Sequence, residues 1–92
     1  MYLKRLNWRI YSLTLNDAVA NRIIQLLKLK NMTQYRLEQE SGICHGAMDR
    51  ILTSQNKTVT LTTIFKLARG FKMTHIEFLD DIDFFSKEIE ID

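Results

Sequence analysis

The segment His45–Leu52 holds the side chains best suited to chemistry with a partner. On a helical wheel, at about 100° per residue, one side is apolar and consists of Ala47, Met48, Ile51 and Leu52. The other side consists of His45, Gly46, Asp49 and Arg50. A helix with one packed face and one polar face fits the DNA major groove, which is wide enough to admit it. We therefore expect these four residues to meet base edges.

Arg50 is the strongest candidate for reading a base. Its guanidinium can bond O6 and N7 of guanine together, which gives roughly 1–3 kcal/mol of discrimination. The alternatives are a phosphate contact or an ion pair with Asp49 or Glu38. His45 can donate or accept a hydrogen bond and could contact a base, a phosphate or only water. Its charged and neutral forms differ, so mild acid is expected to strengthen binding.

Gly46 and Asp49 share that polar face but are less typical of it. Glycine inside a helix costs roughly 0.5–1 kcal/mol relative to alanine. Either Gly46 lets the backbone approach the groove floor, or the position simply tolerates glycine. Asp49 would repel phosphate. It could accept from cytosine N4, although such a residue more often orients a neighbouring arginine.

Contacts to the DNA backbone are expected from helix N-termini and from a polar loop after residue 52. The candidates are Thr33, Gln34, Asn56, Lys57, Thr58, Thr62 and Thr63. Lys57 among polar neighbours is also what any exposed loop looks like. Its functional interpretation depends on the loop lying beside the segment 45–52.

Five helices would position these residues, so the predicted fold is all-α. The apolar spacing and the capping residues predict helices over about 15–30, 34–40, 45–52, 61–71 and from 75 onward. The predicted N-caps are Thr14, Thr33, Thr60 and Thr74, with Gly42 ending the second helix. The fourth helix is expected to bury Leu61, Ile64, Leu67 and Ala68. The absence of proline and the presence of only three glycines favour a compact helical domain.

The two ends of the chain leave alternatives open. Apolar residues recur at steps of four, three and four along Phe78, Ile82, Phe85 and Ile89, which fits an extended C-terminal helix. Alternation around residues 6–10 and 89–91 fits short N- and C-terminal strands instead. The apolar residues near the C-terminus could form a dimer seam or bind a partner; they are Phe78, Ile82, Phe84, Phe85 and Ile89.

Composition limits the class of protein. The 92 residues contain 46% hydrophobic and 26% charged side chains, as ordinary globular domains do. Residues 1–76 carry 12 Lys or Arg against 4 Asp or Glu, a charge of +8, whereas residues 77–92 carry one Lys against 7 acids, a charge of −6. A basic body suits contact with phosphates. The absence of long apolar runs argues against a membrane span and a signal peptide, and the single cysteine suggests a reducing compartment. We expect a cytoplasmic protein.

Several short motifs together carry a family resemblance. They are Thr33-Gln34, Leu37, Ser41-Gly42-Ile43, Met48, Arg50-Ile51-Leu52, Leu61, Ile64, Leu67-Ala68, Thr74 and Glu77-Phe78-Leu79. Over about residues 15–80 the chain resembles the Xre/Cro helix-turn-helix family of phage repressors and bacterial transcriptional regulators. The resemblance implies a compact five-helix, lambda-repressor-like domain that binds operator DNA, usually as a two-fold homodimer, without a cofactor. By position, Gln34 would clamp the DNA backbone, and His45, Gly46 and Arg50 would read bases.

The chain departs from that family at a few positions. Glu38 stands where alanine is usual between the two helices, Cys44 replaces a serine cap, and Lys72 stands where glycine often ends the fourth helix. The resemblance divides the chain into an N-terminal extension (1–14), a helix-turn-helix domain (15–80) and an acidic, apolar C-terminal tail (81–92).

The leading hypothesis is a sequence-specific regulator of transcription that binds double-stranded DNA, and in particular a repressor. The alternative is an antitoxin-like or adaptor module whose acidic tail binds a basic protein partner. An enzyme has little support, since the sequence shows no placeable pair of carboxylates, no glycine-rich phosphate loop and no Cys/His cluster with metal spacing.

Overall fold

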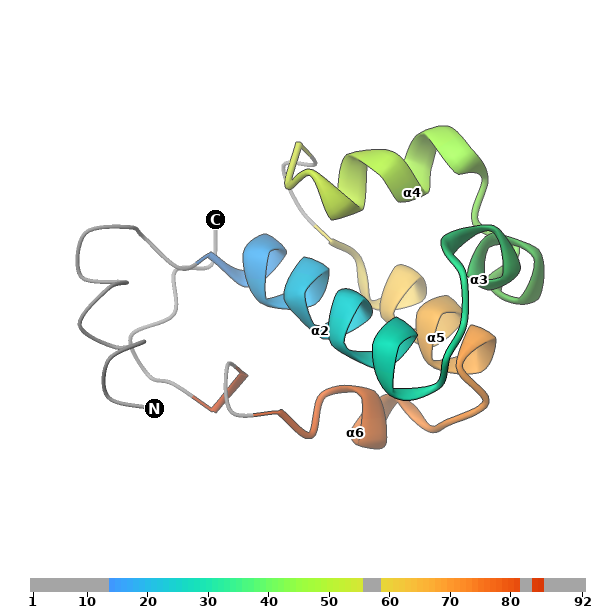
Figure 1. The fold of residues 1–92 in the computed structure, drawn as a ribbon. Helices are drawn as coiled ribbons and strands as arrows, with labels where there is room; N and C mark the ends of the chain where they lie inside the picture. The colour runs from blue at the N-terminus through green and yellow to red at the C-terminus, as the bar shows by residue number, and fades with distance from the viewer. Residues whose placement is uncertain (1–13, 56–58, 82–83, 86–92) are drawn as a thin grey trace.

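The computed structural model describes residues 14–55, 59–81 and 84–85, and within those ranges it contains helices and no strand. The elements are α2 (Leu15–Leu29), α3 (Gln34–Ser41), α4 (His45–Leu52), α5 (Leu61–Gly70) and α6 (His75–Phe78). They follow the predicted order and nearly the predicted bounds (Figure 1). The prediction of an all-α domain is therefore confirmed.

Threonine caps define where four of these helices begin. The side chains of Thr14, Thr33, Thr60 and Thr74 each accept a hydrogen bond from the backbone N–H three residues later. α2 and α6 have complete capping boxes, in which an acidic side chain also accepts from the cap's own N–H. Gly42 is the C-cap of α3 and directly follows its last residue. Its φ of 76° is the left-handed conformation that glycine adopts without strain. These local signals are why the bounds could be predicted.

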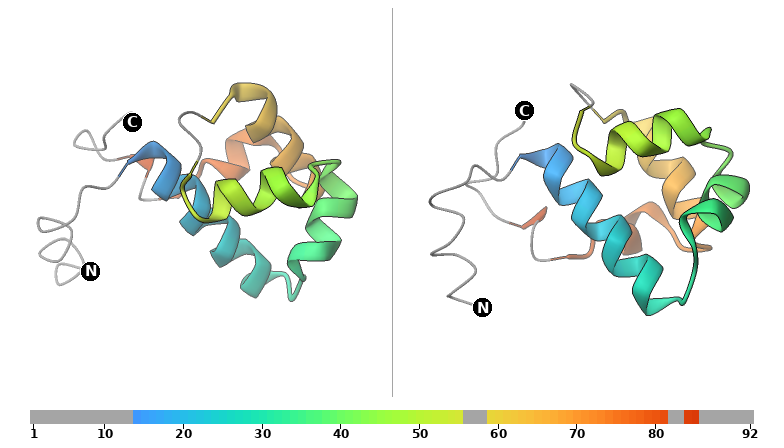
Figure 2. Two further views of the ribbon diagram at one scale, coloured as in Figure 1. Left: turned by 90° about the horizontal axis from the view of Figure 1, so that it is seen from above. Right: turned by 45° about the horizontal axis from the view of Figure 1, so that its top comes forward.

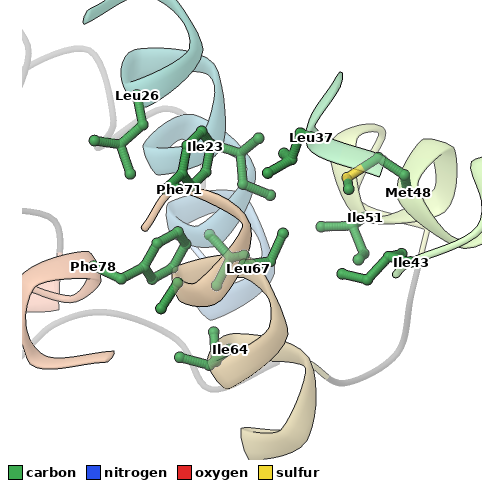
Figure 3. Close-up of a cluster of buried hydrophobic side chains, with 12 residues drawn as sticks. Ile23, Leu26, Leu37, Ile43, Met48, Ile51, Ile64, Leu67, Phe71 and Phe78 are labelled. Atoms are coloured by element: carbon green, nitrogen blue, oxygen red, sulfur yellow. The ribbon is translucent and has the colours of Figure 1, made fainter. Parts of the chain in front are cut away.

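The core lies where α2, α3, α4 and α5 meet, with α6 closing one end (Figure 3). Its largest fully buried side chains are Val19, Ile23, Leu37, Met48, Leu67, Phe71 and Phe78. One predicted core residue is wrong: Leu61 is 66% exposed. Leu61 is the first residue of α5, and helical spacing gives the face of a helix but not whether anything packs over its first turn.

Close contact between α3 and α5 fixes how the helix-turn-helix sits on the domain. A Cβ atom on Gly70 would lie 2.9 Å from Leu37 Cδ1 and 2.9 Å from Ser41 Cβ, so the two helices approach more closely than a larger side chain would allow. α4 packs on α2 instead. α4 lies on the outside of the molecule, along the top in Figure 1 and nearest the viewer in the left view of Figure 2, which is seen from above.

A buried arginine joins the first described helix to the last. The guanidinium of Arg22 donates from Nε to the carbonyl oxygen of Phe78 at 2.7 Å and from Nη2 to that of Glu77 at 2.8 Å. Its Nη1 donates to Gln25 Oε1 at 2.6 Å. The forked guanidinium group matches the positions of these three acceptors. The buried charge of Arg22 is therefore satisfied by hydrogen bonds.

The structure corrects the prediction of an extended C-terminal helix, because α6 ends at Phe78. Arg22 bonds the two carbonyl oxygens that a continuing helix would offer to the next turn, and the Asp81 N–H bonds Leu79 O at 2.9 Å instead. Phe78 itself is fully buried in the core, so its side chain is not available to a partner, contrary to our expectation. The predicted terminal strands fall outside the described residues.

Candidate nucleic-acid interface

α4 presents the polar face that its sequence predicts. His45, Gly46, Asp49 and Arg50 are all exposed. On the opposite side Met48 and Ile51 are buried, and Ala47 and Leu52 are half-buried against the core. The helix-turn-helix consists of α3, the turn at Gly42–Cys44, and α4. The turn is supported by Ser41, whose Oγ accepts from the Ile43 N–H at 3.2 Å.

Arg50 is exposed and unpaired within the part of the chain that the structure describes. No ion pair joins it there to Asp49 or Glu38, the two partners that the sequence offered. Its Nη1 atom lies 3.7 Å from the position that a Cβ on Gly46 would occupy. The guanidinium therefore extends back along α4, beside Gly46, and the exposed side chain remains available to a ligand.

Glu38 links α3 to the start of α4. Its Oε2 atom lies 2.9 Å from His45 Nδ1 and accepts from Gln34 Nε2 at 2.9 Å. The Glu38 side chain is only 9% exposed, whereas that of His45 is largely exposed. The departure from alanine at this position thus gives a hydrogen-bonded ion pair across the helix-turn-helix.

Glu38 and His45 each shift the pKa of the other. The hydrogen bond to Glu38, followed by the charge of that carboxylate, raises the pKa of His45 above its ordinary value of 6.5. The hydrogen bond from Gln34, and next that from His45, lowers the pKa of Glu38 below its ordinary value of 4.5. Both shifts favour the charged pair, so His45 is a cation over a wider pH range than a free histidine.

The candidate phosphate contacts lie at two helix N-termini. Thr33 is exposed, and its hydroxyl caps α3 by accepting from the Arg36 N–H at 3.1 Å. Gln34 is half-buried and uses one amide hydrogen on Glu38. Thr62 is exposed at the start of α5, whereas Thr63 is half-buried with its Oγ1 3.0 Å from that of Thr60. Asn56, Lys57 and Thr58 lie outside the described residues.

The C-terminal contact candidates separate by exposure. Phe84 is half-buried against the core, and Phe85 is 68% exposed. Ile82 and Ile89 lie outside the described residues. Of the apolar set named from the sequence, Phe85 is therefore the described residue whose side chain faces solvent.

Two residues with hydrogen bonds to another helix, Arg22 and Glu38, were not among the site residues predicted from the sequence. Arg22 follows Val19 by three positions and precedes Leu26 by four, so its place on the buried face of α2 was a readable signal. Glu38 was visible as a departure from the family. Its seven-residue separation from His45, across the turn, gave no local indication that the two would bond.

The described residues offer little that would suit another kind of site. No group of three or more His, Cys, Asp or Glu that could hold a metal ion occurs in the described ranges. None of the described helices has the length and apolar character needed to cross a membrane. A shallow hollow of about 560 Å³ lies between α5 and α6, where the rings of Phe65 and His75 stack with centroids 4.3 Å apart.

Comparison with known protein families settles the class. A family model described as the Cro/C1-type HTH DNA-binding domain matches residues 22–83, more than half of the chain. The chain belongs to this family. No curated protein and no solved structure matches the sequence. As a Cro/C1-type domain the protein is a DNA-binding regulator, which confirms the resemblance noted from the helix-turn-helix residues.

Proposed function

We propose that this Cro/C1-type protein binds operator DNA in a sequence-specific manner, reads the major groove with α4, and represses transcription. The observation that carries the proposal is the exposed face of α4, where His45, Gly46, Asp49 and Arg50 lie free of the core while the opposite face holds the helix in place. A helix supported from one side can enter the groove without unfolding. Such a protein would act in the cytoplasm, where bacterial operators are.

In this proposal the two helices of the motif divide the work. The N-terminus of α3, with Thr33 and Gln34, faces a phosphate, since backbone N–H groups in a first turn lack intrahelical acceptors. Arg50 reads guanine through its two-pronged guanidinium. Repression follows if the operator overlaps a promoter, because a bound domain then excludes the polymerase.

The test is selection of binding sites from random duplex DNA, followed by titration of the selected site with variants. Arg50→Ala is expected to lose roughly 1–3 kcal/mol of discrimination at one base pair. Lys66→Ala is the matched control, since Lys66 is an exposed cation on α5, outside the helix-turn-helix. Selection of no shared sequence, or equal losses in the two variants, would contradict the proposal. Repression itself is tested with a reporter that carries the selected site in its promoter.

Dependence on salt tests the phosphate contacts separately. The logarithm of affinity should fall with the logarithm of salt concentration by about 0.9 per phosphate neutralised. Lys57→Ala is expected to weaken selected and random DNA alike and to reduce this slope. An affinity that does not change with salt would count against the electrostatic contribution.

We further propose that the protein binds its operator as a homodimer and that Phe85 contributes to the contact, since it is an exposed phenyl ring directly after Phe84, which packs against the core. Sedimentation of the wild type against Phe85→Ser tests this, with a shift toward monomer expected.

The same exposed ring, followed by acidic residues toward residue 92, also suits a basic protein partner as a second candidate function. A wild-type monomer that binds its operator with full affinity would count against the homodimer. A monomer that co-purifies with a basic protein, and loses it on Phe85→Ser, would favour the second candidate.

A further inference from the structure

We propose that Glu38 is a specificity-determining residue: by fixing the proton on His45 Nδ1, it makes Nε2 the ring atom that reads DNA and lets pH change which base is preferred there. The inference rests on the proposed function, since it needs α4 in the major groove. It concerns a residue that contacts no base itself and therefore acts as a positioning residue.

The hydrogen bonds around Glu38 determine which nitrogen of His45 carries a proton. An ionised carboxylate can only accept, and its Oε2 atom receives both Gln34 Nε2 and His45 Nδ1 at 2.9 Å. Nδ1 must then be the protonated nitrogen in the neutral ring. Because that N–H points into the helix-turn-helix, Nε2 is left on the exposed side, with a lone pair when the ring is neutral and a proton when it is charged.

These two states of Nε2 match different base edges. A lone pair accepts from an amino group, and in the major groove those are adenine N6 and cytosine N4. An N–H donates to an acceptor, and guanine offers two, at O6 and N7. Uptake of one proton from solvent therefore moves the preference at a single base pair from an amino-bearing base toward guanine.

The charged groups around His45 place this change in an accessible pH range. Glu38 on α3 and Asp49 on α4 both favour the cation. The positive end of the α4 dipole and the exposed Arg50 oppose it. Arg36 and Glu40 of α3 pair with each other.

On α2, which also packs against α4, the ionisable groups are held elsewhere or exposed. Asp17 bonds Ser54, and Arg22 bonds the end of α6. Lys28 and Lys30 are exposed. The raised pKa of His45 agrees with the dominance of Glu38.

The experiment has a DNA arm and a proton arm. In the first, the operator base pair that faces His45 is changed to each of the four pairs, and affinity is measured at about pH 6 and about pH 8.5, on either side of the ordinary titration of histidine. For the wild type, the ratio of affinities for guanine over adenine should fall about tenfold from the lower to the higher pH.

Two variants test whether Glu38 is responsible. Glu38→Ala should move the midpoint of this change to lower pH, because Glu38 is what raises the pKa of His45. The same variant should reduce the size of the change, because the ring then loses its fixed tautomer. His45→Gln, which carries no titrating proton, should remove the change. In the second arm, ¹⁵N NMR of the free wild-type protein should show the proton on Nδ1 at high pH. This measurement needs no variant to fold and no DNA.

The outcomes separate this inference from the proposed function. Specific binding that depends on Arg50 but shows the same base ratio at both pH values would overturn the inference alone. A neutral His45 ring protonated on Nε2 would also overturn it. If no duplex is preferred and Arg50→Ala has no effect, the proposed function fails and the inference fails with it.

Discussion

The guanidinium of Arg22 donates a hydrogen bond to the carbonyl oxygen of Phe78 at 2.7 Å, and so one side chain of α2 bonds the last residue of α6. The same guanidinium bonds the carbonyl oxygen of Glu77, so a single buried cation satisfies the end of a four-residue helix that has little stability of its own. The contact spans 56 residues of sequence and closes the core around the fully buried Phe78 ring.

We expect Arg22→Ala to lower the free energy of unfolding by about 1–3 kcal/mol, since it removes the donor that bonds the Phe78 carbonyl oxygen and one of the donors to that of Glu77. Arg22→Lys should recover only part of this, because one ammonium cannot reproduce the fork. Urea denaturation measures both. The control is Arg36→Ala, which breaks an exposed pair with Glu40 worth about 0–1 kcal/mol. Equal losses for Arg22→Ala and Arg36→Ala would show that Arg22 is not needed.

The two helical glycines should respond to alanine in opposite directions. Gly70→Ala would place a methyl group against Leu37 and Ser41, and we expect a loss of about 1–3 kcal/mol in unfolding free energy from overpacking. Gly46→Ala meets only the end of the Arg50 side chain, 3.7 Å away, and should raise stability by about 0.5–1 kcal/mol. Thermal unfolding of the two variants side by side checks the contrast, and a stable Gly70→Ala would refute the close approach of α3 and α5.

Gly46→Ala also separates the two interpretations of this glycine. If the backbone approaches the groove floor there, the more stable variant should bind its operator about tenfold more weakly, which corresponds to 1.4 kcal/mol. If the position merely tolerates glycine, affinity should be unchanged. Titration of the selected operator decides between them, with circular dichroism confirming that α4 stays helical.

The Glu38–His45 pair should make stability depend on pH in a defined window. The raised pKa of His45 means that its contribution is complete below about pH 6.5 and is lost as pH rises through the folded-state pKa. The lowered pKa of Glu38 means that its contribution is complete above about pH 4.5 and is lost as pH falls through its folded-state value.

The difference in stability between the wild type and Glu38→Ala should therefore be largest between these two pH values and shrink on either side. Urea denaturation at a series of pH values measures it, and His45→Ala should show the same window. A difference that is constant from acid to alkali would mean that the pair is not formed in solution.

Lys72 occupies a backbone conformation that suits glycine. Its φ is 58°, in the left-handed region, directly after the C-cap of α5. Lys72→Gly should raise the free energy of unfolding by about 1 kcal/mol, because glycine adopts this conformation without strain. Loss of the exposed ion pair between Lys72 and Glu40 would reduce this gain. Lys66→Gly, in the middle of the same helix, should instead lower it by about 1 kcal/mol. Calorimetry on both variants tests the sign, and a loss in both would show that Lys72 is not strained.

The sequence by itself determined the order of the helices, where they begin, and the two faces of α4. Caps such as Thr33 and Thr60 act within one helical turn, and the split between Met48 and Arg50 follows from the helical period, so both were readable without a fold. Neither depends on any contact between distant residues.

Only the tertiary structure decided which side chains were enclosed and which distant groups met. Leu61 has the spacing of a core residue but lies exposed at the start of α5, and Phe78 lies in the core, although its spacing also fitted a surface stripe. The bonds from Arg22 to α6 and from Glu38 to His45 join separate helices. Periodicity predicts the face of a helix, but not what packs against it, because the packing depends on how helices far apart in the chain cross.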